Sequence, residues 1–470
     1  MISLLALAAA APIAAVSAAP QAQISVNART RFQQVDGFGF SEAFQRAEDI
    51  YGKDGLSPEN RTKVLDLLFS DTHGAGLTIV RNGIGSSNSS ISDFMISIEP
   101  FSPGLPSAPP HYIWNGNDSG QVWLSQQAAS YGVNTFYADA WSAPGYMKTN
   151  DDDSNGGYLC GVTNTSCATG DWKQAYANYL VQYVRFYQQV GIKITHLGFL
   201  NEPQEDVTYA SMLSDGTQAA DFIKVLAPTV KAAGLDVKLT CCDGVGWEQQ
   251  RAMLPGLQAG GPEHSAESLL SVITSHGYNS PPTTPLETSL PVWMTEWADL
   301  TGNYTAAWYE NGAAGEGLTW ANRIQNAFTQ SNVSAFLHWI GAENSTSNSA
   351  LVNLHGDSYV ATKRLWAFGQ FSRFVRPGAV RIAASSSDPL VTVSAFQNKD
   401  NGVVATQVIN NADTDYEVEV DLTGYGPVSV IQPYLTNNEN DLEALKPVVA
   451  VGGKFTSVVP ARSMVSFVSK

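Results

Sequence analysis

Short apolar runs alternate with longer amphipathic stretches over most of the chain, which is the pattern expected of repeated strand and helix units. Eight such runs are found, at residues 35–43, 77–85, 134–144, 194–203, 237–246, 272–279, 292–298 and 335–344. Because eight strand and helix units close a parallel barrel, the pattern predicts an α/β fold, a (β/α)8 TIM barrel over residues 35–378. An open, doubly wound sheet is the alternative, and the lack of a Gly-rich loop after the first run argues against it.

Helix signals separate several of these runs. Residues 57–70 begin with Ser and Pro, which suit the cap and the first turn of a helix. Residues 171–191 begin with Asp and stop at Gly, and residues 362–377 stop at Pro. These three stretches are therefore predicted as helices of the barrel.

The pattern changes from about residue 380 onward, where apolar and polar residues alternate strictly between Gly, Asn, Asp and Pro breaks. Such alternation is typical of antiparallel strands with one buried face. We predict an antiparallel side β-domain, a β-sandwich, over residues 379–470. A similar run at residues 22–34 predicts an N-terminal strand that joins the same sheet.

The first 18 residues form an apolar run that ends in small residues, which predicts a secretory signal peptide although the usual basic start is missing. No later run is long enough to span a bilayer. Seven Asn-x-Ser/Thr sequons support exposure to glycosylation. We therefore expect a secreted, extracellular glycoprotein. The candidate sites are Asn60, Asn88, Asn117, Asn164, Asn303, Asn332 and Asn344.

The composition limits the possible partners. A net charge of −17 argues against nucleic acid and against anionic membranes, because a polyanion would be repelled. Aromatic residues make up 10% of the chain, including 11 Trp, and flat aromatic faces stack well on sugar rings, although most aromatics are ordinary core residues. A neutral carbohydrate polymer is thus the favoured partner, and we expect a monomer.

The four cysteines are too few for a disulfide framework. Cys160 and Cys167 flank a loop rich in Gly, Asn and Thr, and their spacing suits a local disulfide. Cys241 and Cys242 are adjacent at a strand end and fit either two buried thiols or a vicinal bridge. No Cys/His spacing resembles a zinc site, so neither a metal nor a cofactor is expected.

Two predicted strands end in a glutamate. Glu202 lies at the end of residues 194–203, and Glu296 lies in residues 292–298, three strand and helix units later. The C-terminal strand ends of a barrel form its active site, so the two carboxyls would face each other across the mouth. Two carboxyls about 5 to 5.5 Å apart are what retaining glycosidases use, one as nucleophile and one as acid and base. For either glutamate alone, a salt bridge to a neighbouring strand is the alternative.

Five motifs lie at the ends of the first four and the seventh predicted strands: "GFGFSEA", "RNGIG", "WSAPGYMKTN", "FLNEP" and "WMTEWA". Together they resemble glycoside hydrolase family 30, and the resemblance covers essentially the whole chain after residue 18. It implies a (β/α)8 barrel with a side β-domain built from both termini. It also implies that Glu202 is the acid/base and Glu296 the nucleophile of a double displacement.

The same resemblance suggests roles for neighbouring residues. Asn201 would hydrogen-bond the sugar 2-hydroxyl, while Arg81 and Tyr278 would hold the nucleophile ionised and oriented. His276 fits a hydrogen-bonding residue behind the site equally well, and core packing is the alternative for each Trp. The remaining predicted substrate-binding residues are Trp141, His276, Trp297 and Trp339.

Members of the family cleave xylans, β-1,6-galactans, β-1,6-glucans and glucosylceramide, so the fold does not fix the substrate. The chain is most similar to the fungal xylanase branch, which implies hydrolysis of β-1,4-xylosidic bonds in glucuronoxylan of the plant cell wall. Release of xylobiose from chain ends is a further expectation. The alternatives are an endo-β-1,6-galactanase, a β-1,6-glucanase and, outside the enzymes, a non-catalytic carbohydrate-binding protein.

Arg46, just beyond the first strand, is the candidate for binding a glucuronic acid branch, because a guanidinium can grip a carboxylate with two N–H groups. An ion pair with Glu48 or Asp49 is the alternative. Residues 341–357 lack the basic residues that bacterial glucuronoxylanases carry after the eighth strand. The long connection over residues 86–120 is expected to wall off one end of the cleft.

Overall fold

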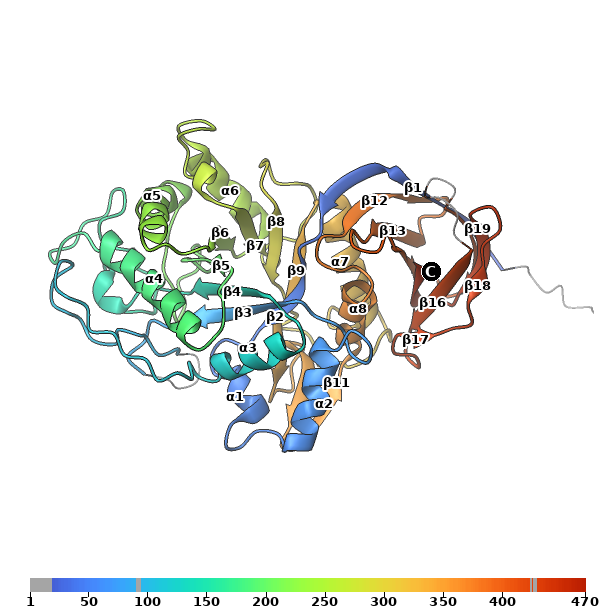
Figure 1. Ribbon diagram of the computed structural model, residues 1–470, viewed down its shortest axis with the longest axis horizontal. Coiled ribbons are helices and arrows are strands. Elements are labelled where there is room, and N and C mark those ends of the chain that lie inside the picture. The colour runs from blue at the N-terminus through green and yellow to red at the C-terminus, as the bar shows by residue number, and fades with distance from the viewer. Residues whose placement is uncertain (1–18, 90–93, 423–424, 426–428) are drawn as a thin grey trace, which may run out of the picture.

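The computed structural model of the protein describes residues 19–89, 94–422, 425 and 429–470. The predicted signal peptide, residues 1–18, lies outside this range. The described chain forms a barrel wrapped by helices and, beside it, a β-domain that carries the C-terminus (Figure 1). Among the described residues, no helix is both long enough and apolar enough to cross a membrane.

Parallel strands form a closed barrel, in which neighbours along the chain pair in order and β9 pairs with both β8 and β2. The barrel strands are β2 (Gly37–Ser41), β3 (Ile79–Ile84), β4 (Thr135–Ala140), β5 (His196–Leu197), β6 (Lys238–Gly244), β7 (Val272–His276), β8 (Val292–Glu296) and β9 (Ala335–Glu343). Each predicted run contains one of them, which confirms the predicted barrel. Two strands that the pattern does not predict, β10 (Ala350–His355) and β11 (Ser358–Ala361), extend the sheet beyond β9.

Helices cover the outside of the barrel (Figure 1). They are α1 (Arg46–Tyr51), α2 (Pro58–Phe69), α3 (Gln121–Ser130), α4 (Lys173–Gln189), α5 (Gly216–Ala232), α6 (Trp247–Gln258), α7 (Gly317–Gln330) and α8 (Lys363–Ser372), with short 3-10 turns at Gly145–Met147 and Glu267–Leu269. The start of α2 is as predicted, because the Ser57 side chain accepts a hydrogen bond from the first turn. In contrast, α8 ends before Pro377. Beyond it, Arg373 donates to the backbone carbonyls of residues 71–72, in a turn that replaces the last predicted helical turn.

Apolar side chains fill the N-terminal half of the barrel. The inward-facing cluster consists of Ile79, Tyr137, Val272, Trp293, Ala335 and Leu337. Trp293 also donates its indole N–H to Asp36, just before β2. Because this cluster plugs the barrel, the polar side chains at the C-terminal end lie on a closed, apolar floor.

The β5 strand is much shorter than the predicted run at residues 194–203. Gly198 follows it and passes so close to Asp139 that an added Cβ would lie 2.1 Å from the Asp139 Oδ1. The chain then leaves the ladder, and Glu202 adopts a φ of 46°, in the left-handed region that few non-glycine residues occupy. Its backbone N–H donates to the Asp243 carbonyl at 2.8 Å. The predicted strand end is therefore a shaped turn that directs Glu202 into the barrel mouth.

The side β-domain is one sheet wrapped around its own apolar core. Its strands are β1 (Gln21–Gln34), β12 (Val380–Ser386), β13 (Val391–Gln397), β14 (Val404–Asn410), β15 (Tyr416–Asp421), β16 (Val430–Thr436), β17 (Glu443–Ala444), β18 (Val448–Val449), β19 (Lys454–Val459) and β20 (Ser463–Ser469). The predicted N-terminal strand joins this sheet: β1 pairs antiparallel with β12 and parallel with β15. The sheet is therefore mixed, not purely antiparallel as predicted, because no hairpin fixes the direction of a strand that comes from the other end of the chain.

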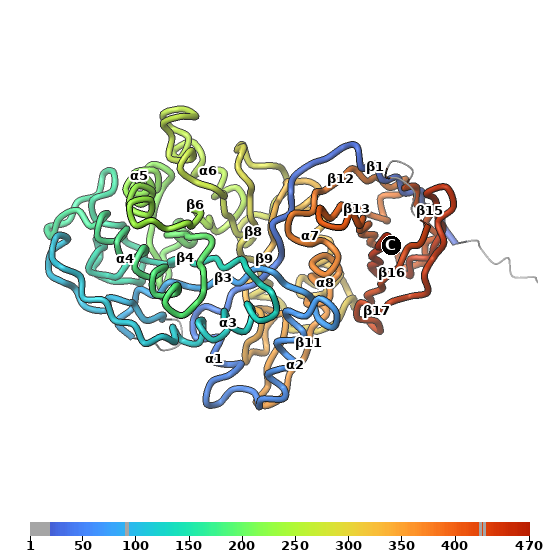
Figure 2. Tube along the Cα trace, viewed as in Figure 1, coloured from blue at the N-terminus to red at the C-terminus, as the bar shows by residue number. Residues whose placement is uncertain are grey.

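The long connection between β3 and α3 packs along the side of the barrel. In its described part, Trp114 stacks on Phe186 of α4 with ring centroids 5.0 Å apart, and Ser97 is hydrogen-bonded to Tyr179 of α4. Figure 2 shows this segment, between β3 and α3, along the outer edge beside α4. None of its described residues lines the cavity at the barrel mouth, so they do not form the expected wall of the cleft.

Both cysteine pairs form disulfides. Cys160 and Cys167 are joined by an S–S bond of 2.01 Å, which confirms the predicted bridge. Cys241 and Cys242 in β6 are bonded to each other, so the vicinal bridge is found and not two thiols. Both residues of this second pair are buried.

The sequon asparagines differ in exposure. Asn60 and Asn117 are half-buried, and each forms a side-chain hydrogen bond. The exposed ones are Asn88, Asn164, Asn303, Asn332 and Asn344. Glycosylation at these positions stays a prediction.

Candidate active site

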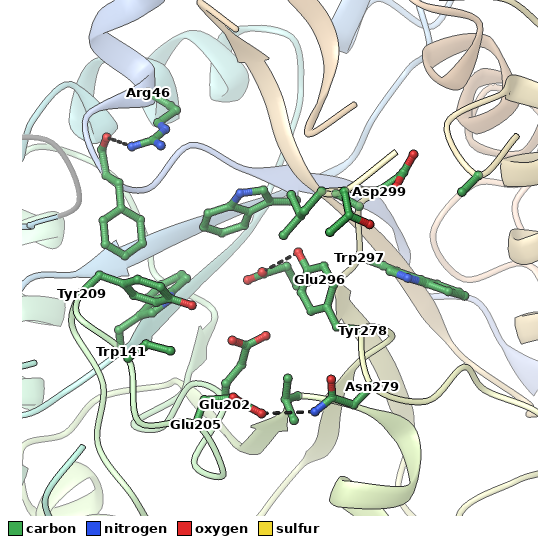
Figure 3. A pocket seen from close by; sticks show the side chains of 18 of the residues that line it. Arg46, Trp141, Glu202, Glu205, Tyr209, Tyr278, Asn279, Glu296, Trp297 and Asp299 are labelled. Atoms are coloured by element: carbon green, nitrogen blue, oxygen red, sulfur yellow. Dashed lines mark hydrogen bonds between the residues drawn. The ribbon is translucent and has the colours of Figure 1, made fainter. Parts of the chain in front are cut away.

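A cavity of about 630 Å³ opens at the C-terminal ends of the barrel strands (Figure 3). This volume is typical of a ligand site. Both predicted catalytic glutamates line it, one from the turn after β5 and one from the end of β8. The remaining lining residues are Phe44, Arg46, Trp141, Glu205, Val207, Tyr209, Val245, Tyr278, Asn279, Trp297, Ala298, Asp299, Leu300, Thr301, Ala314, Arg323 and Trp339.

Glu202 and Glu296 face each other at the base of this cavity, and they are only 8% and 5% exposed. One carboxylate oxygen of each, together with one ring nitrogen of His276, all lie within 4.8 Å of one another. This separation fits a retaining pair, at about 5 to 5.5 Å, and not an inverting pair, which needs about 6.5 to 9.5 Å to admit a water. The barrel thus brings the two predicted residues together at the spacing that double displacement requires.

Glu296 is held by donors at both oxygens. The Arg81 Nη1 donates to its Oε2 at 2.5 Å, and the Tyr278 hydroxyl donates to its Oε1 at 2.8 Å. Arg81 is fully buried, and its guanidinium lies 4.3 Å from the centroid of the Trp141 ring. Its Nη2 also donates to Asn201, at 2.6 Å. The arginine therefore fixes the position of Glu296 and of the residue next to Glu202.

Glu202 is held at one oxygen only. Its Oε1 lies 2.8 Å from the His276 Nδ1, while its Oε2 has no hydrogen-bond partner among the described residues. An acid/base residue needs one oxygen that can reach the leaving group and the attacking water. The Glu202 side chain has this arrangement, and the Glu296 side chain does not.

Asp243, in β6, connects the two halves of the site, and the sequence analysis does not single it out. Its Oδ1 lies 3.2 Å from the His276 Nε2 and 3.6 Å from the Arg81 Nη2. The hydroxyls of Tyr137, Thr274 and Thr295 also donate to its carboxylate. The only sequence signal for it is an acid at the end of the fifth predicted strand.

Burial and charge oppose each other in this cluster. Burial raises the pKa of Glu296, while His276 and Arg81 act to lower it. For His276 the nearby carboxylates of Glu296, Asp243 and Glu202 outweigh burial and raise its pKa to about 10. For Asp243, Arg81 and His276 outweigh burial and lower its pKa to about 2. At Asp243 and His276 the opposite charges of the cluster therefore outweigh the effect of burial.

The predicted substrate-binding residues divide into two groups. Trp141, Tyr278, Trp297 and Trp339 line the cavity with the additional aromatics Phe44 and Tyr209. Asn201, Arg81 and His276 are buried directly behind it and do not line it. His276 thus corresponds to the hydrogen-bonding residue behind the site, not to a substrate ligand.

Arg46 lines the cavity but is already paired. Its Nε lies 3.2 Å from the Glu343 Oε2, at the end of β9, and its Nη1 donates to the Phe44 carbonyl at 2.8 Å. Among the described residues, the ion pair of Arg46 is therefore with Glu343 and not with Glu48 or Asp49. The partner lies 297 residues away along the chain, so the local sequence gives no signal for it.

A second arginine, Arg323 of α7, also lines the cavity, and the sequence analysis does not single it out. Its guanidinium lies 4.5 Å from the Trp297 ring and 4.7 Å from the Trp320 ring. Burial lowers its pKa to about 10, so it keeps its positive charge near neutral pH. Among the described residues it forms no ion pair, which distinguishes it from Arg46.

Glu202, His276 and Glu296 are the described residues whose spacing could hold a metal ion. Their donor atoms already bond to one another or to Arg81, Tyr278 and Asp243. A protonated imidazole has no lone pair for a metal. The donor set therefore favours internal hydrogen bonds over metal binding.

Comparison with known proteins agrees with this geometry. The family model described as O-Glycosyl hydrolase family 30 matches residues 21–254, and that of the family 30 beta sandwich domain matches residues 378–467. The catalytic domain of the family 30 xylanase C from Talaromyces cellulolyticus is 46% identical with a TM-score of 0.86, over 95% of this chain and 100% of that one. An endo-1,6-beta-D-glucanase from Trichoderma harzianum is 25% identical over 76% of this chain and 72% of its own length. A glucuronoxylanase from Bacillus subtilis is 28% identical over 38% of this chain and 39% of its own length. The chain belongs to glycoside hydrolase family 30.

Proposed function

We propose that this glycoside hydrolase cleaves β-1,4-xylosidic bonds of xylan with retention, with Glu296 as nucleophile and Glu202 as acid/base. The observation that carries the assignment is the asymmetry of the pair. Both oxygens of Glu296 accept hydrogen bonds from fixed donors, whereas Glu202 keeps one oxygen without a partner among the described residues. A nucleophile must be ionised and aimed, and an acid/base must exchange a proton with ligands in the cavity.

The reaction has two steps. First, the Glu296 carboxylate attacks the anomeric carbon while Glu202 gives its proton to the glycosidic oxygen; an ester bond forms as the glycosidic bond breaks. Then Glu202 takes a proton from water, the water oxygen attacks the same carbon, and Glu296 leaves as a carboxylate. Asn201 lies directly behind the cavity surface and accepts from Arg81 through its Oδ1. Its 3% exposure leaves the amide hydrogens as proposed donors to a sugar 2-hydroxyl that reaches the base of the cavity.

Substitution of the two glutamates tests these roles. We expect Glu296→Ala to lower the hydrolysis rate by on the order of 10⁴-fold or more, and Glu202→Gln by about 10² to 10⁴-fold. Glu205→Gln is the matched control, because this cavity carboxylate is hydrogen-bonded to Asn279 and lies outside the reacting pair. It should lose far less. A Glu296→Ala protein as fast as the wild type would overturn the assignment and leave a carbohydrate-binding protein.

The choice of xylan is supported by the 46% identity to a family 30 xylanase. The 25% identity to an endo-1,6-beta-D-glucanase supports β-1,6-glucan as the second candidate, and β-1,6-galactan is the third. Mass-spectrometric product profiles on glucuronoxylan, unbranched xylan, β-1,6-glucan and β-1,6-galactan would decide. Xylo-oligosaccharides from the first two substrates are expected, with xylobiose among them if the enzyme also acts at chain ends. Gluco- or galacto-oligosaccharides alone would exclude xylan while keeping the mechanism.

Binding of a glucuronic acid branch is proposed for Arg46, with Arg323 as the competing residue in the same cavity. The ion pair with Glu343 opposes the role of Arg46. Arg323 forms no salt bridge among the described residues, although the nearby Asp299 carboxylate acts to raise its pKa. We expect Arg46→Ala to cost about tenfold or more on glucuronoxylan and much less on linear xylo-oligosaccharides. The same selective loss in Arg323→Gln instead would move the uronate site to α7. Equal losses on both substrates would mean that neither residue reads the branch.

Secretion, action on the plant cell wall and a monomeric state complete the proposal. Secretion rests on the apolar N-terminal run and the sequons, and action on the plant cell wall follows from the proposed xylan substrate. Expression in a glycosylating host, with N-terminal sequencing of the protein from the medium, tests the first point. Light scattering of the purified protein tests the last.

A further inference from the structure

We propose that Asp243 and His276 form a positioning pair that supplies a second buried cation beside Arg81, and that this cation keeps Glu296 ionised. The inference rests on the proposed role of Glu296 as nucleophile. Neither residue lines the cavity, so both act through the glutamates and not through the substrate. His276 is fully buried. In the proposed reaction the protons move between Glu202, the glycosidic oxygen and water, not through the His276 ring.

The hydrogen-bond geometry carries the charge assignment. The His276 Nδ1 lies 2.8 Å from the Glu202 Oε1, and its Nε2 lies 3.2 Å from the Asp243 Oδ1 and 3.8 Å from the Glu296 Oε2. A neutral imidazole has one N–H and could donate to only one of these carboxyls. Two hydrogen bonds between the ring and these carboxyls therefore need one more proton than a neutral imidazole has. This proton lies either on the ring or on one of the carboxyls.

The surroundings of Asp243 place that extra proton on the ring. Its carboxylate accepts from three hydroxyl groups and lies beside Arg81, an arrangement that favours its ionised form. Asp139, which also pairs with Arg81, differs: burial and the Asp243 charge hold its pKa well above the usual range. In the reactive state the Glu202 proton lies on Oε2, the oxygen that reaches the leaving group, so Oε1 still accepts from the His276 ring. Arg81 and His276 then face the two carboxylates Asp243 and Glu296.

The charged and titratable groups that face His276 come from all the strands packed around it. They are Arg81 of β3, Asp139 of β4, Glu202 after β5, Asp243 of β6, Tyr278 after β7 and Glu296 of β8. Arg81 is the only other cation in this set. Removal of the His276 charge therefore leaves Glu296 more dependent on a single partner, against a burial effect that raises its pKa.

The pH dependence of kcat/KM tests the pair, measured on whichever polysaccharide the enzyme hydrolyses. His276→Gln should move the acidic limb of the profile to higher pH, by about one pH unit or more, because Glu296 must be ionised to attack. Asp243→Asn should move the limb in the same direction, because the ring then loses the partner that holds its second proton. Slower enzymes with an unmoved acidic limb would overturn the proposal.

Asp139→Asn is the matched control. Like Asp243, Asp139 is a fully buried partner of Arg81, at 2.9 Å, but no hydrogen bond joins it to His276 in the described structure. Because burial and the Asp243 charge hold the pKa of Asp139 well above the usual range, the change to Asn should remove less negative charge than Asp243→Asn does. Its acidic limb should stay at the wild-type pH whatever happens to the rate. A shift as large as that of Asp243→Asn would mean that the limb reports general disturbance.

Imidazole NMR tests the charge directly and without a substrate. The protein has 7 His, and the His276 ring signal in ¹⁵N-histidine-labelled protein can be assigned by its loss in His276→Gln. Imidazolium shifts are expected from pH 5 to 8 in the wild type. A neutral ring at pH 7 would overturn the inference even if Glu296→Ala is inactive, whereas a fully active Glu296→Ala would overturn the proposed function whatever the ring charge.

Discussion

Two clusters of buried carboxylates lie in the same barrel, and they are stabilised in different ways. At the mouth, Glu296 and Asp243 are surrounded by the cations Arg81 and His276. Away from the mouth, just before α3, the carboxylate of Asp118 is fully buried but accepts hydrogen bonds only from neutral donors. These donors are Gln121 of α3 and Tyr183 and Tyr187 of α4.

The difference between the clusters is visible in their acid strength. Burial raises the pKa of Asp118 to about 6, in spite of three hydrogen bonds. Arg81 and His276 outweigh a similar burial at Asp243 and lower its pKa to about 2. Neutral donors thus reduce the increase in pKa that burial causes, while neighbouring cations turn it into a decrease. A site that must keep a carboxylate ionised at acid pH needs cations, and of these two clusters only the one at the mouth contains them.

We expect the largest effect from a substitution that removes the buried arginine of the cluster at the mouth. Arg81→Met would leave Glu296, Asp243 and Asp139 without their shared partner. Loss of one member of a buried ion pair costs about 3 to 5 kcal/mol, so we expect at least that loss in the free energy of unfolding. Activity should fall as well, because Glu296 loses the donor to its Oε2. Urea unfolding and hydrolysis rates of the folded fraction measure the two effects.

Arg364→Met is the control for this change. Arg364 of α8 is also fully buried, but its guanidinium donates mainly to backbone carbonyls, those of Thr305, Gly315 and Ala350. We expect Arg364→Met to destabilise the fold while the folded fraction keeps its rate within about tenfold. If both variants lost activity equally, the special role of the cluster at the mouth would be refuted.

The sequence predicts the catalytic pair because a barrel has few degrees of freedom. Once eight apolar runs are recognised, the ends of the fourth and seventh runs must meet at the mouth, which places Glu202 beside Glu296. The parallel register of the strands does the same for Arg81 and Tyr278. These predictions need only the order of the strands and the chemistry of their last residues.

Other features depend on contacts that local sequence does not encode. Asp243 looks like any acid at a strand end until the rings and hydroxyls of three other strands surround it. Arg46 pairs with Glu343, which is distant in sequence, although Glu48 and Asp49 are nearer along the chain. The parallel pairing of β1 with β15 likewise joins the two ends of the chain without a turn to predict it.

An intermediate effect concerns the pH dependence of stability at Asp118. Its folded-state pKa of about 6 lies above the ordinary Asp value of 3.8, so the folded protein binds this proton more tightly than the unfolded chain. Stability from this group is therefore greatest at low pH and falls as pH rises from about 4 to about 6. Asp118→Asn removes the titration. We expect the variant to gain about 2 to 3 kcal/mol relative to the wild type between pH 4 and pH 7.

Urea unfolding of both proteins gives the difference in free energy of unfolding between variant and wild type at each pH. The change in this difference from pH 4 to pH 7 is the expected gain. The Asn side chain keeps a carbonyl oxygen for the donors, which all reach the same Asp118 oxygen, Oδ2. Other groups titrate equally in both proteins and cancel. A stability difference that is the same at both pH values would show that Asp118 is ionised in the folded state even at pH 4, and the contrast with Asp243 would disappear.

The smallest effects come from the removal of one hydroxyl in each cluster. Tyr278→Phe deletes the 2.8 Å hydrogen bond to Glu296, and Tyr187→Phe deletes the 2.6 Å hydrogen bond to Asp118. Each bond to a charged group is worth about 1.5 to 3 kcal/mol. At the mouth the loss should appear as a rate reduced by about tenfold or more. Arg81 still holds one oxygen of Glu296, but it cannot by itself fix the orientation of the carboxylate. At Asp118 the loss should appear as a lower free energy of unfolding with an unchanged hydrolysis rate.

Thermal unfolding and kcat for the two Phe variants give four numbers that separate the clusters. If Tyr187→Phe also slowed hydrolysis, the two clusters would be coupled through β3 and α4, and the distinction between structural and catalytic carboxylates would fail. If Tyr278→Phe cost stability and no rate, the aim of Glu296 would depend on Arg81 alone. We expect Tyr278→Phe to lose rate and Tyr187→Phe to lose stability. Each hydroxyl supports the role of the carboxylate to which it donates. Glu296 reacts, whereas Asp118 only ties α3 to α4.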